Sequence, residues 1–478
     1  MLFNSLSFAI FLPIVFILYW FATKNNFKLQ NMLLLIASYF FYACWDYRFL
    51  FLLLFSTLLD YFSGIKIFEA ENKKKRTFWL WVSICINLGL LGYFKYCNFF
   101  ITSFAEGLTD LGVKFNIHTL QIILPVGISF YTFHGLSYVI DIYKERIKAE
   151  NNFINYAVFV CFFPLLIAGP IERATNLLPQ IVKKREFDYS KAVDGLRQIL
   201  WGLFKKIVIA DNCAIYADAV FDNYNDYSGI TLFWGVFLFT FQIYCDFSGY
   251  TDIAIGTARL FGINLLRNFA FPYFSRNIAE FWRRWNITLS TWFRDYLYIP
   301  LGGSKGGVWM KTRNIFIIFL VSGFWHGANW TFIIWGFINA VYVLPSVLFK
   351  TNRDNLNIVA QGRILPNLKE LLSMTFTFGL TVFAFIFFRS ENIEHAVRYV
   401  SKLFSFSGNS TAFSVPVALV LLIAGFIIAE WRGREQQYAI ADVGLKWPKI
   451  IRWSLYYGLA LVIFYFSTSG KQFIYFQF

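Results

Sequence analysis

A histidine inside an apolar stretch is the strongest single candidate for catalysis. His326 lies in the segment GFWHGANW, residues 323–330, and its flanking glycines permit a helix break or a close backbone approach. A neutral imidazole accepts a proton near neutral pH, so this side chain could act as a general base. A structural histidine bonded to a neighbouring helix fits the same pattern, and the spacing alone leaves both interpretations open.

A second candidate is the basic and aromatic segment from Arg276 to Tyr296. At about 100° per residue its polar and apolar positions fall on two faces: Arg276, Arg283 and Arg294 on one, and Ile278, Trp285, Leu289, Trp292 and Tyr296 on the other. The pattern predicts one helix in the membrane interface, with its arginines toward headgroups or an anionic ligand. A purely structural interfacial helix would show the same pattern.

The other histidines are weaker candidates. His134 follows an interruption at Pro125 and Gly127 that could mark a re-entrant segment lining a cavity, whereas His118 and His395 lie in loop-like, moderately polar segments. Other ionisable residues inside apolar stretches should face a protein interior or a wet cavity. These are Asp60, Lys95, Asp141, Glu172, Arg173, Asp246 and Asp252.

Motifs of several other enzyme classes are absent from the sequence. There is no Ser/His/Asp order, P-loop or HExxH motif, so hydrolase, ATPase and metalloprotease functions have no support. The six cysteines have no CxxC spacing and lie mostly in apolar runs, where cysteine behaves as a small hydrophobic residue. The sequence therefore predicts no disulfide and no metal site.

The elements that position these residues must be membrane helices. Of the 478 residues, 58% are hydrophobic and 15% charged, which is more apolar surface than a soluble domain buries. Apolar runs recur along the chain and approach the roughly 20 residues that cross a bilayer. They are 33–42, 49–59, 78–93, 153–168, 233–244, 315–324, 371–388, 416–429 and 453–466. We expect about eleven spans, the first of them Ser5 to Ala22, which has no basic region or cleavage site of a signal peptide.

The net charge of +15 comes from lysines and arginines in short loops between the apolar runs. Such loops mark the cytoplasmic side and face anionic headgroups, and no nucleic-acid partner is implied. They lie at residues 73–76, 183–185 and 432–452. With the last loop inside, the aromatic tail 473–478 lies outside. No repeat or linker divides the sequence, which predicts a single membrane domain over residues 1–478.

The segment 277–303, NIAEFWRRWNITLSTWFRDYLYIPLGG, closely resembles the signature of the membrane-bound O-acyltransferase (MBOAT) family. The chain is most similar to the subgroup of bacterial alginate O-acetyltransferase membrane components, and the similarity covers essentially its whole length. Four other segments carry it: MLFNS at 1–5, residues 124–143, residues 163–173 and YCDFSGYTD at 244–252. The signature-bearing core extends over approximately residues 121–345.

The resemblance implies an all-α polytopic MBOAT fold, with re-entrant and interfacial helices around a transmembrane tunnel. It places the catalytic histidine on His326. Many members of the subgroup have a second histidine where this chain has Asn286, whose amide can polarise or position a carbonyl but cannot take a proton. An acyl thioester, acetyl-CoA or an acyl carrier, is the expected donor, with its anionic head near Arg283, Arg284, Arg294 and Trp285. No bound cofactor is expected.

By the same resemblance, the acyl group moves outward through an aromatic C-terminal tail. Tyr475 is a candidate acyl relay, although an interfacial aromatic anchor explains that tyrosine as well. The expected function is O-acetylation of an exported, alginate-like polysaccharide at the bacterial inner membrane, completed by an extracytoplasmic acetyltransferase partner. Peptidoglycan O-acetylation and teichoic-acid D-alanylation remain alternatives within the family. A transporter or a non-catalytic membrane scaffold remains an alternative outside it.

Overall fold

The computed structural model describes residues 1–478 except 24–25, 113–119, 121, 168, 406–412 and 468–478. The described part consists of α-helices with short π- and 3₁₀-helical turns and contains no strand. The predicted all-α class is therefore confirmed. Tyr475, the tail 473–478 and His118 lie outside the described residues.

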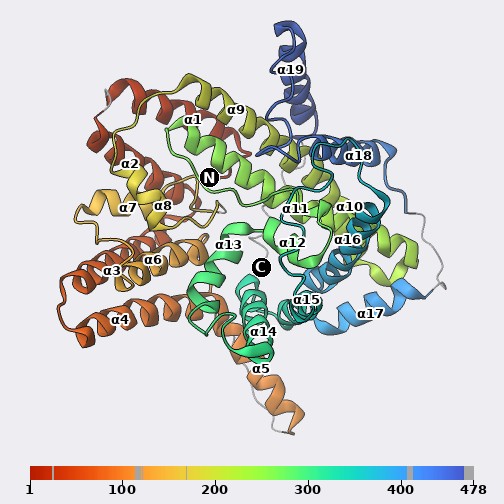
Figure 1. Ribbon diagram of the computed structural model, residues 1–478, viewed down its shortest axis with the longest axis horizontal. Helices are drawn as coiled ribbons and strands as arrows, with labels where there is room; N and C mark the ends of the chain where they lie inside the picture. Colours follow the sequence, from red (N-terminus) through yellow and green to blue (C-terminus); the bar gives the residue numbers. More distant parts are fainter. Residues whose placement is uncertain (24–25, 113–119, 121, 168, 406–412, 468–478) are drawn as a thin grey trace. The chain divides into compact units, whose positions relative to one another are not determined.

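The helices follow one another along the whole chain (Figure 1). In order they are α1 (Leu6–Ile17), α2 (Phe27–Asp46), α3 (Leu50–Glu69), α4 (Lys73–Leu91), α5 (Cys97–Asp110), α6 (Ile128–Tyr143), α7 (Phe153–Cys161), α8 (Ala174–Ile181), α9 (Tyr189–Leu203), α10 (Asp211–Asp222), α11 (Gly229–Leu260), α12 (Ile278–Arg284), α13 (Ile287–Phe293), α14 (Gly307–His326), α15 (Trp330–Leu348), α16 (Leu368–Arg389), α17 (Ile393–Phe404), α18 (Val417–Arg432) and α19 (Lys449–Tyr465).

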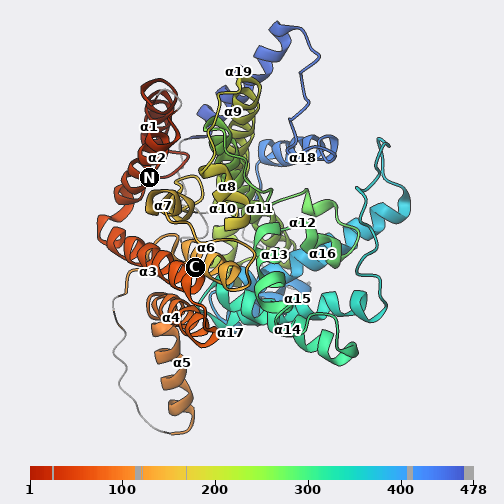
Figure 2. The ribbon, with the colours of Figure 1, turned by 60° about the vertical axis from the view of Figure 1, so that its left-hand side comes forward.

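Two compact units divide the chain. Unit 1 comprises Met1–Ala192 and Thr257–Leu265, and unit 2 comprises Val193–Gly256 and Leu266–Phe478. Within unit 1, α3, α4 and α6 lie side by side, and α5 continues beyond the end of α4 (Figures 1 and 2). The single membrane domain expected from the sequence stays a prediction.

Five helical segments in the described part of the chain are long and apolar enough to cross a membrane. They are Phe27–Glu69, Lys73–Asp110, Gly229–Leu260, Trp330–Leu348 and Leu368–Arg389. Leu6–Ala22, the predicted first span, is apolar but shorter. The protein is thus a polytopic membrane protein, and the predicted number of about eleven spans stays a prediction.

The apolar run at residues 153–168 does not form the span predicted for it. Only Phe153–Cys161 is helical, and the helix ends before Pro164. From Tyr156 to Leu166, every residue except Pro164 is apolar with an exposed fraction of 2% or less. The run is apolar because it is buried inside unit 1, a situation that hydropathy alone does not distinguish from contact with lipid.

In unit 2, α14 and α15 form a tightly packed hairpin that positions His326 (Figure 2). A Cβ added to Gly323 would lie 2.2 Å from the carbonyl oxygen of Phe332, and one added to Gly336 would lie 2.3 Å from that of Phe319. These two glycines therefore allow the two backbones to touch. Glycine at 323 was expected to permit a close backbone approach, and the structure confirms this.

Asparagine side chains begin several helices around the site. Asn277 accepts a hydrogen bond from the backbone N–H of Glu280 at the start of α12. Asn329 accepts one from Thr331 at the start of α15, and its own amide donates to the carbonyl of Glu391. Because the first N–H groups of a helix have no partner within it, these caps fix where each helix begins.

Candidate active site

The signature segment is not the single interfacial helix that its periodicity predicts. It is broken into α12 and α13 at Trp285 and Asn286, and a π-helical turn, Arg294–Tyr298, follows. Trp285 is extended, with φ −103° and ψ 127°, and Asn286 is left-handed, with φ 42° and ψ 55°. Partners distant in sequence hold this break, so the local 3.6-residue pattern contains no sign of it.

The break is tied to a neighbouring segment by four hydrogen bonds. The backbone N–H of Ile287 donates to the carbonyl of Asn268 over 2.9 Å, and Ala270 donates to the carbonyl of Arg284, also over 2.9 Å. The side-chain oxygen of Asn268 accepts from both the N–H and the hydroxyl of Thr288. Asn268 is 1% exposed, so these bonds form in a buried setting that strengthens them.

Asn286 has an unusual environment at this break. Its side chain is 2% exposed, and neither amide atom has a hydrogen-bond partner among the described residues. A buried amide without partners costs about 1–3 kcal/mol. Asparagine tolerates the left-handed backbone conformation better than most residues. The result is a fixed amide, with both donor and acceptor available to a bound molecule.

Trp285 anchors the break in an aromatic cage. Its ring lies 5.1 Å from that of Phe269, 5.4 Å from Phe281 and 5.7 Å from Phe385, measured between centroids. The side chain is 3% exposed. Trp285 therefore fixes the position of the adjacent Asn286, and its indole is enclosed by protein.

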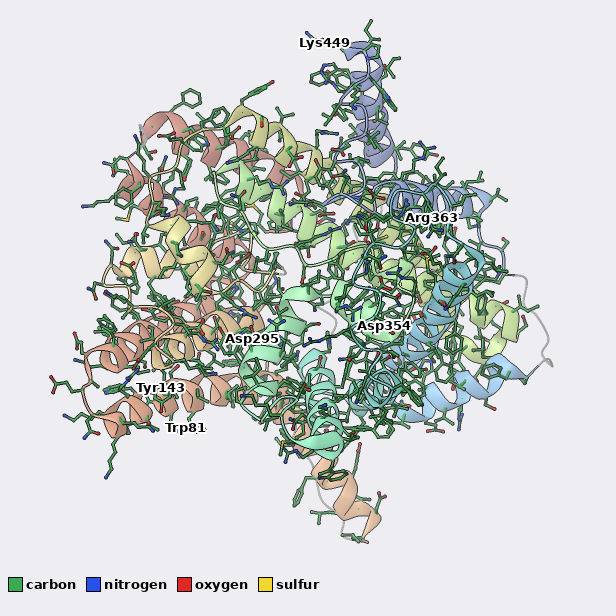
Figure 3. All side chains as sticks on the ribbon, in the orientation of Figure 1. Trp81, Tyr143, Asp295, Asp354, Arg363 and Lys449 are labelled. Atoms are coloured by element: carbon green, nitrogen blue, oxygen red, sulfur yellow. The ribbon has the colours of Figure 1, made fainter. Side chains whose placement is uncertain are left out.

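The signature arginines are bound to protein groups. Glu280, which is 1% exposed, forms ion pairs with Arg276 at 3.1 Å and with Arg284 at 2.8 Å. Arg283 donates to the backbone carbonyls of Asn352 and Asp354 over 2.6 and 2.9 Å, and Figure 3 labels Asp354 in this loop. Arg283 and Arg284 thus fasten the segment before α16 to α12.

Arg294 is more accessible than the other two predicted donor-binding arginines. Its side chain is 58% exposed, and its guanidinium pairs with Asp295 over 2.7 Å. Figure 3 labels Asp295 beside α13. A role of these arginines in binding the donor or headgroups stays a prediction, and Arg294 has the most room for it.

His326 is the last residue of α14, at the point where Gly327 ends the helix. Its ring is 4% exposed and lies 4.9 Å from Trp325, 5.1 Å from Trp335 and 5.3 Å from Phe388, between centroids. The flanking glycines were expected to permit a helix break or a close approach, and α14 does end at Gly327. The imidazole is therefore held rigidly in an aromatic environment.

Aromatic contacts connect His326 with the signature segment. Trp335 touches His326 and also Trp282 of α12, with centroids 5.1 and 5.7 Å apart. On another route, Phe388 contacts His326, and Phe385 contacts both Phe388 and Trp285. The structure thus brings His326 and Asn286 into one neighbourhood of unit 2. One or two aromatic rings separate the imidazole from the signature segment.

Asp246 and Asp252 of α11 face the protein interior, as expected for ionisable residues in an apolar stretch. Their lysine partners were not predicted. Lys205 pairs with Asp252 at 2.5 Å, and Lys206 pairs with Asp246 at 2.7 Å. Both lysines are less than 4% exposed. Two adjacent lysines in the apolar run FKKIVIA, residues 204–210, were the signal that could have revealed this network.

Two other histidines have structural surroundings. His134 lies inside α6, is 1% exposed, and accepts a hydrogen bond at Nε2 from the backbone N–H of Glu172. His395 lies on α17 and not in the loop expected for it, and it stacks on Tyr224 with centroids 4.5 Å apart. Asn392 begins that helix by accepting a hydrogen bond from the backbone N–H of His395, and asparagine at this position is the local signal for the helix start.

Comparisons with known proteins agree with this geometry. The model of the MBOAT, membrane-bound O-acyltransferase family matches residues 143–388. The probable alginate O-acetylase AlgI of Pseudomonas putida is 36% identical over 100% of both chains. That of Pseudomonas aeruginosa is 41% identical over 92% of this chain and 82% of its own. The peptidoglycan O-acetyltransferase of Helicobacter pylori is 37% identical over 86% and 81%.

The match to the family model includes both candidate catalytic residues and the whole signature segment. Together with relatives that align over the full length, it confirms the resemblance drawn from the sequence. The enzyme class follows, since these relatives are O-acetylases and O-acetyltransferases. The chain belongs to the membrane-bound O-acyltransferase family.

Proposed function

We propose that this acyltransferase moves acetyl from a cytoplasmic thioester donor to hydroxyl groups of an exported, alginate-like polysaccharide. The observation that supports a catalytic site is the buried amide of Asn286, which has no partner in the described chain and lies in the aromatic neighbourhood of His326. The full-length similarity to the P. putida protein supports the acceptor class. The bacterial inner membrane is the expected location.

In the proposed chemistry, His326 accepts the proton of the attacking hydroxyl while the hydroxyl oxygen bonds to the carbonyl carbon of the thioester. The Nδ2–H of Asn286 donates to the carbonyl oxygen as that oxygen becomes negative. The carbon–sulfur bond then breaks, and the leaving thiolate takes the proton back from the imidazolium. An ester and a free thiol result. The aromatic surroundings of His326 exclude water, which limits hydrolysis of the donor.

A direct test compares glycan esters in cells that carry wild type, His326→Ala or Asn286→Ala at matched membrane abundance. Esters on extracellular and cell-wall glycans are released and identified by mass spectrometry. His395→Gln is the control, because His395 is a buried histidine on α17 stacked on Tyr224. We expect both active-site variants to lose the ester and the control to keep it. Unchanged glycan esters in His326→Ala would overturn the proposal.

Peptidoglycan O-acetylation is the second candidate, favoured by the 37% identity to the H. pylori enzyme. The same experiment separates the candidates, since the sugar that loses its ester in His326→Ala identifies the acceptor. Loss of D-alanine from teichoic acid in His326→Ala would point instead to teichoic-acid D-alanylation.

We also propose that an extracytoplasmic acetyltransferase completes the transfer, with Tyr475 as an acyl relay. Reconstituted chain without partners should then consume donor but leave the glycan unmodified. Tyr475→Phe should abolish a covalent acetyl adduct on the tail and preserve binding of the donor. Glycan acetylation by the chain alone in proteoliposomes would remove the need for a partner.

A further inference from the structure

A basic pocket in unit 1 is separate in sequence from the catalytic residues. It has a volume of about 670 Å³ and lies between the π-helical turn that follows α1 (Leu18–Ala22), the loop before α9 and the end of α11. Five cationic side chains line it against two carboxylates, Glu186 and Asp188. The cations are Lys183, Lys184, Arg185, Lys191 and Arg259.

Arg185 is the buried member of this set. It is 4% exposed, and its guanidinium lies over the ring of Tyr19 at 5.6 Å. One nitrogen donates to the side-chain oxygen of Asn31, whereas Nε and Nη1 have no partner among the described residues. Burial lowers the pKa of this guanidinium. A buried cation without a carboxylate is costly, so a nearby anion would stabilise it.

The two carboxylates of the lining do not neutralise the pocket. Asp188 accepts hydrogen bonds from the backbone N–H groups of Ser190 and Lys191 and caps α9. It also pairs with Lys191 at 3.6 Å. Lys183 and Lys184 are exposed and form no ion pair within the described residues. The pocket therefore keeps an excess of positive charge that faces solvent.

The rim of the pocket is aromatic and adjoins an apolar helix. Trp20 and Phe187 meet edge to face at 5.4 Å, and Trp20 donates to the carbonyl of Leu260, which removes a negative helix end from the pocket. Next to this rim, α1 exposes Ile10, Ile14 and Ile17, each more than half exposed. Aromatic rings between an apolar surface and cations are typical of a membrane interface.

We propose that this pocket binds the phosphate group of an anionic membrane lipid, with Lys183, Lys184 and Arg185 as its cationic ligands. The acyl chains of the lipid then lie along the exposed apolar face of α1. Phosphate accepts hydrogen bonds from several cationic donors at once, which suits the unpartnered nitrogens of Arg185. The proposal is independent of the acyltransfer chemistry.

Native mass spectrometry of the full-length, detergent-purified protein tests this proposal. Wild type, Lys183→Gln/Lys184→Gln and Lys73→Gln/Lys74→Gln are titrated with phosphatidylglycerol and with phosphatidylcholine. Lys73 and Lys74 are a matched control, because they are exposed lysines of the same unit that do not line the pocket. At about 1 kcal/mol for each lysine near an anionic surface, the pocket variant should bind phosphatidylglycerol roughly 30-fold more weakly. The control should match wild type.

Competition with inorganic phosphate and with coenzyme A distinguishes the source of the phosphate. Displacement of phosphatidylglycerol only by other anionic lipids supports the proposal. The proposal would be overturned, in favour of a soluble ligand, if coenzyme A displaced the lipid and bound wild type more tightly than the Lys183→Gln/Lys184→Gln variant. Equal retention of phosphatidylglycerol by wild type and the pocket variant would also overturn it. His326→Ala should bind the lipid normally, so failure here is distinguishable from failure of the proposed function.

Discussion

The imidazole of His326 meets the indole of Trp335 edge to face, with centroids 5.1 Å apart and planes at 89°. Trp335 lies on α15 and also contacts Trp282 of the signature helix α12, with ring centroids 5.7 Å apart. The same indole therefore supports both parts of the candidate site. Its size, more than its polarity, should determine how the histidine is oriented.

Trp335→Phe should lower turnover roughly 10- to 100-fold and leave the KM for the acyl donor nearly unchanged, since a small displacement of a catalytic group has this effect. Steady-state kinetics in reconstituted membranes separate the two constants. Trp81→Phe is the control, because Trp81 on α4 is 56% exposed and is labelled in Figure 3. Equal effects on turnover and stability for both variants would contradict a positioning role.

Two substitutions at Asn286 separate backbone strain from amide chemistry. Asn286→Gly keeps the left-handed conformation at no steric cost but removes the amide. We expect normal thermal stability and a fall in turnover of about 100- to 1000-fold, as when one donor to a developing oxyanion is lost. Asn286→Asp, which keeps an acceptor but not the donor, should be similarly impaired. An active Asn286→Gly enzyme would show that the amide is not needed.

Gly323→Ala should separate α14 from α15, because its new methyl group would collide with the backbone of Phe332. We expect a loss of activity and a lower unfolding temperature. Gly379→Ala on α16 is the control, since nothing lies within 4 Å of a Cβ added there. Thermal unfolding in detergent, measured together with acetyl transfer, checks both variants.

Glu280→Gln should loosen the loop before α16. Removing the carboxylate leaves the guanidinium of Arg284 without the charge of Glu280, and leaves Arg276 with only the longer pair to Glu370 at 3.8 Å. Loss of one partner of a largely buried ion pair costs about 3–5 kcal/mol. Limited proteolysis at residues 351–362 and the unfolding temperature report the effect. Glu69→Gln, which breaks the exposed pair with Lys66, should change stability by less than about 1 kcal/mol. Equal unfolding temperatures and equal proteolysis of the two variants would show that Glu280 does not hold this loop.

Features that depend on local composition could be predicted from the sequence. The membrane class, the all-α fold and the family followed from apolar runs and from the signature at residues 277–303. The glycines around His326 were expected to permit a helix break or a close backbone approach, and the structure has the break at Gly327 and the close approach at Gly323. These outcomes depend on residue type within a few positions of the chain.

Features that depend on distant partners could not be predicted. The break at Asn286 is held by Asn268 and by the cage around Trp285, and neither interrupts the helical period of the segment. The same applies to Arg283, whose guanidinium was expected to face an anion but donates to backbone carbonyls some 70 residues away. A periodic pattern shows which side of a helix is polar but not which group meets it.

The role of His326 as the base of acyl transfer can be measured through the rate of acetyl transfer by a His326→Gln variant. Labelled acetyl is followed from a thioester donor to glycan in membrane vesicles that contain the partner proteins, with His395→Gln as control. We expect His326→Gln to be folded and to transfer acetyl about 100- to 10,000-fold more slowly, the range for loss of a general base. A folded His326→Gln variant that transfers acetyl at the wild-type rate would contradict it.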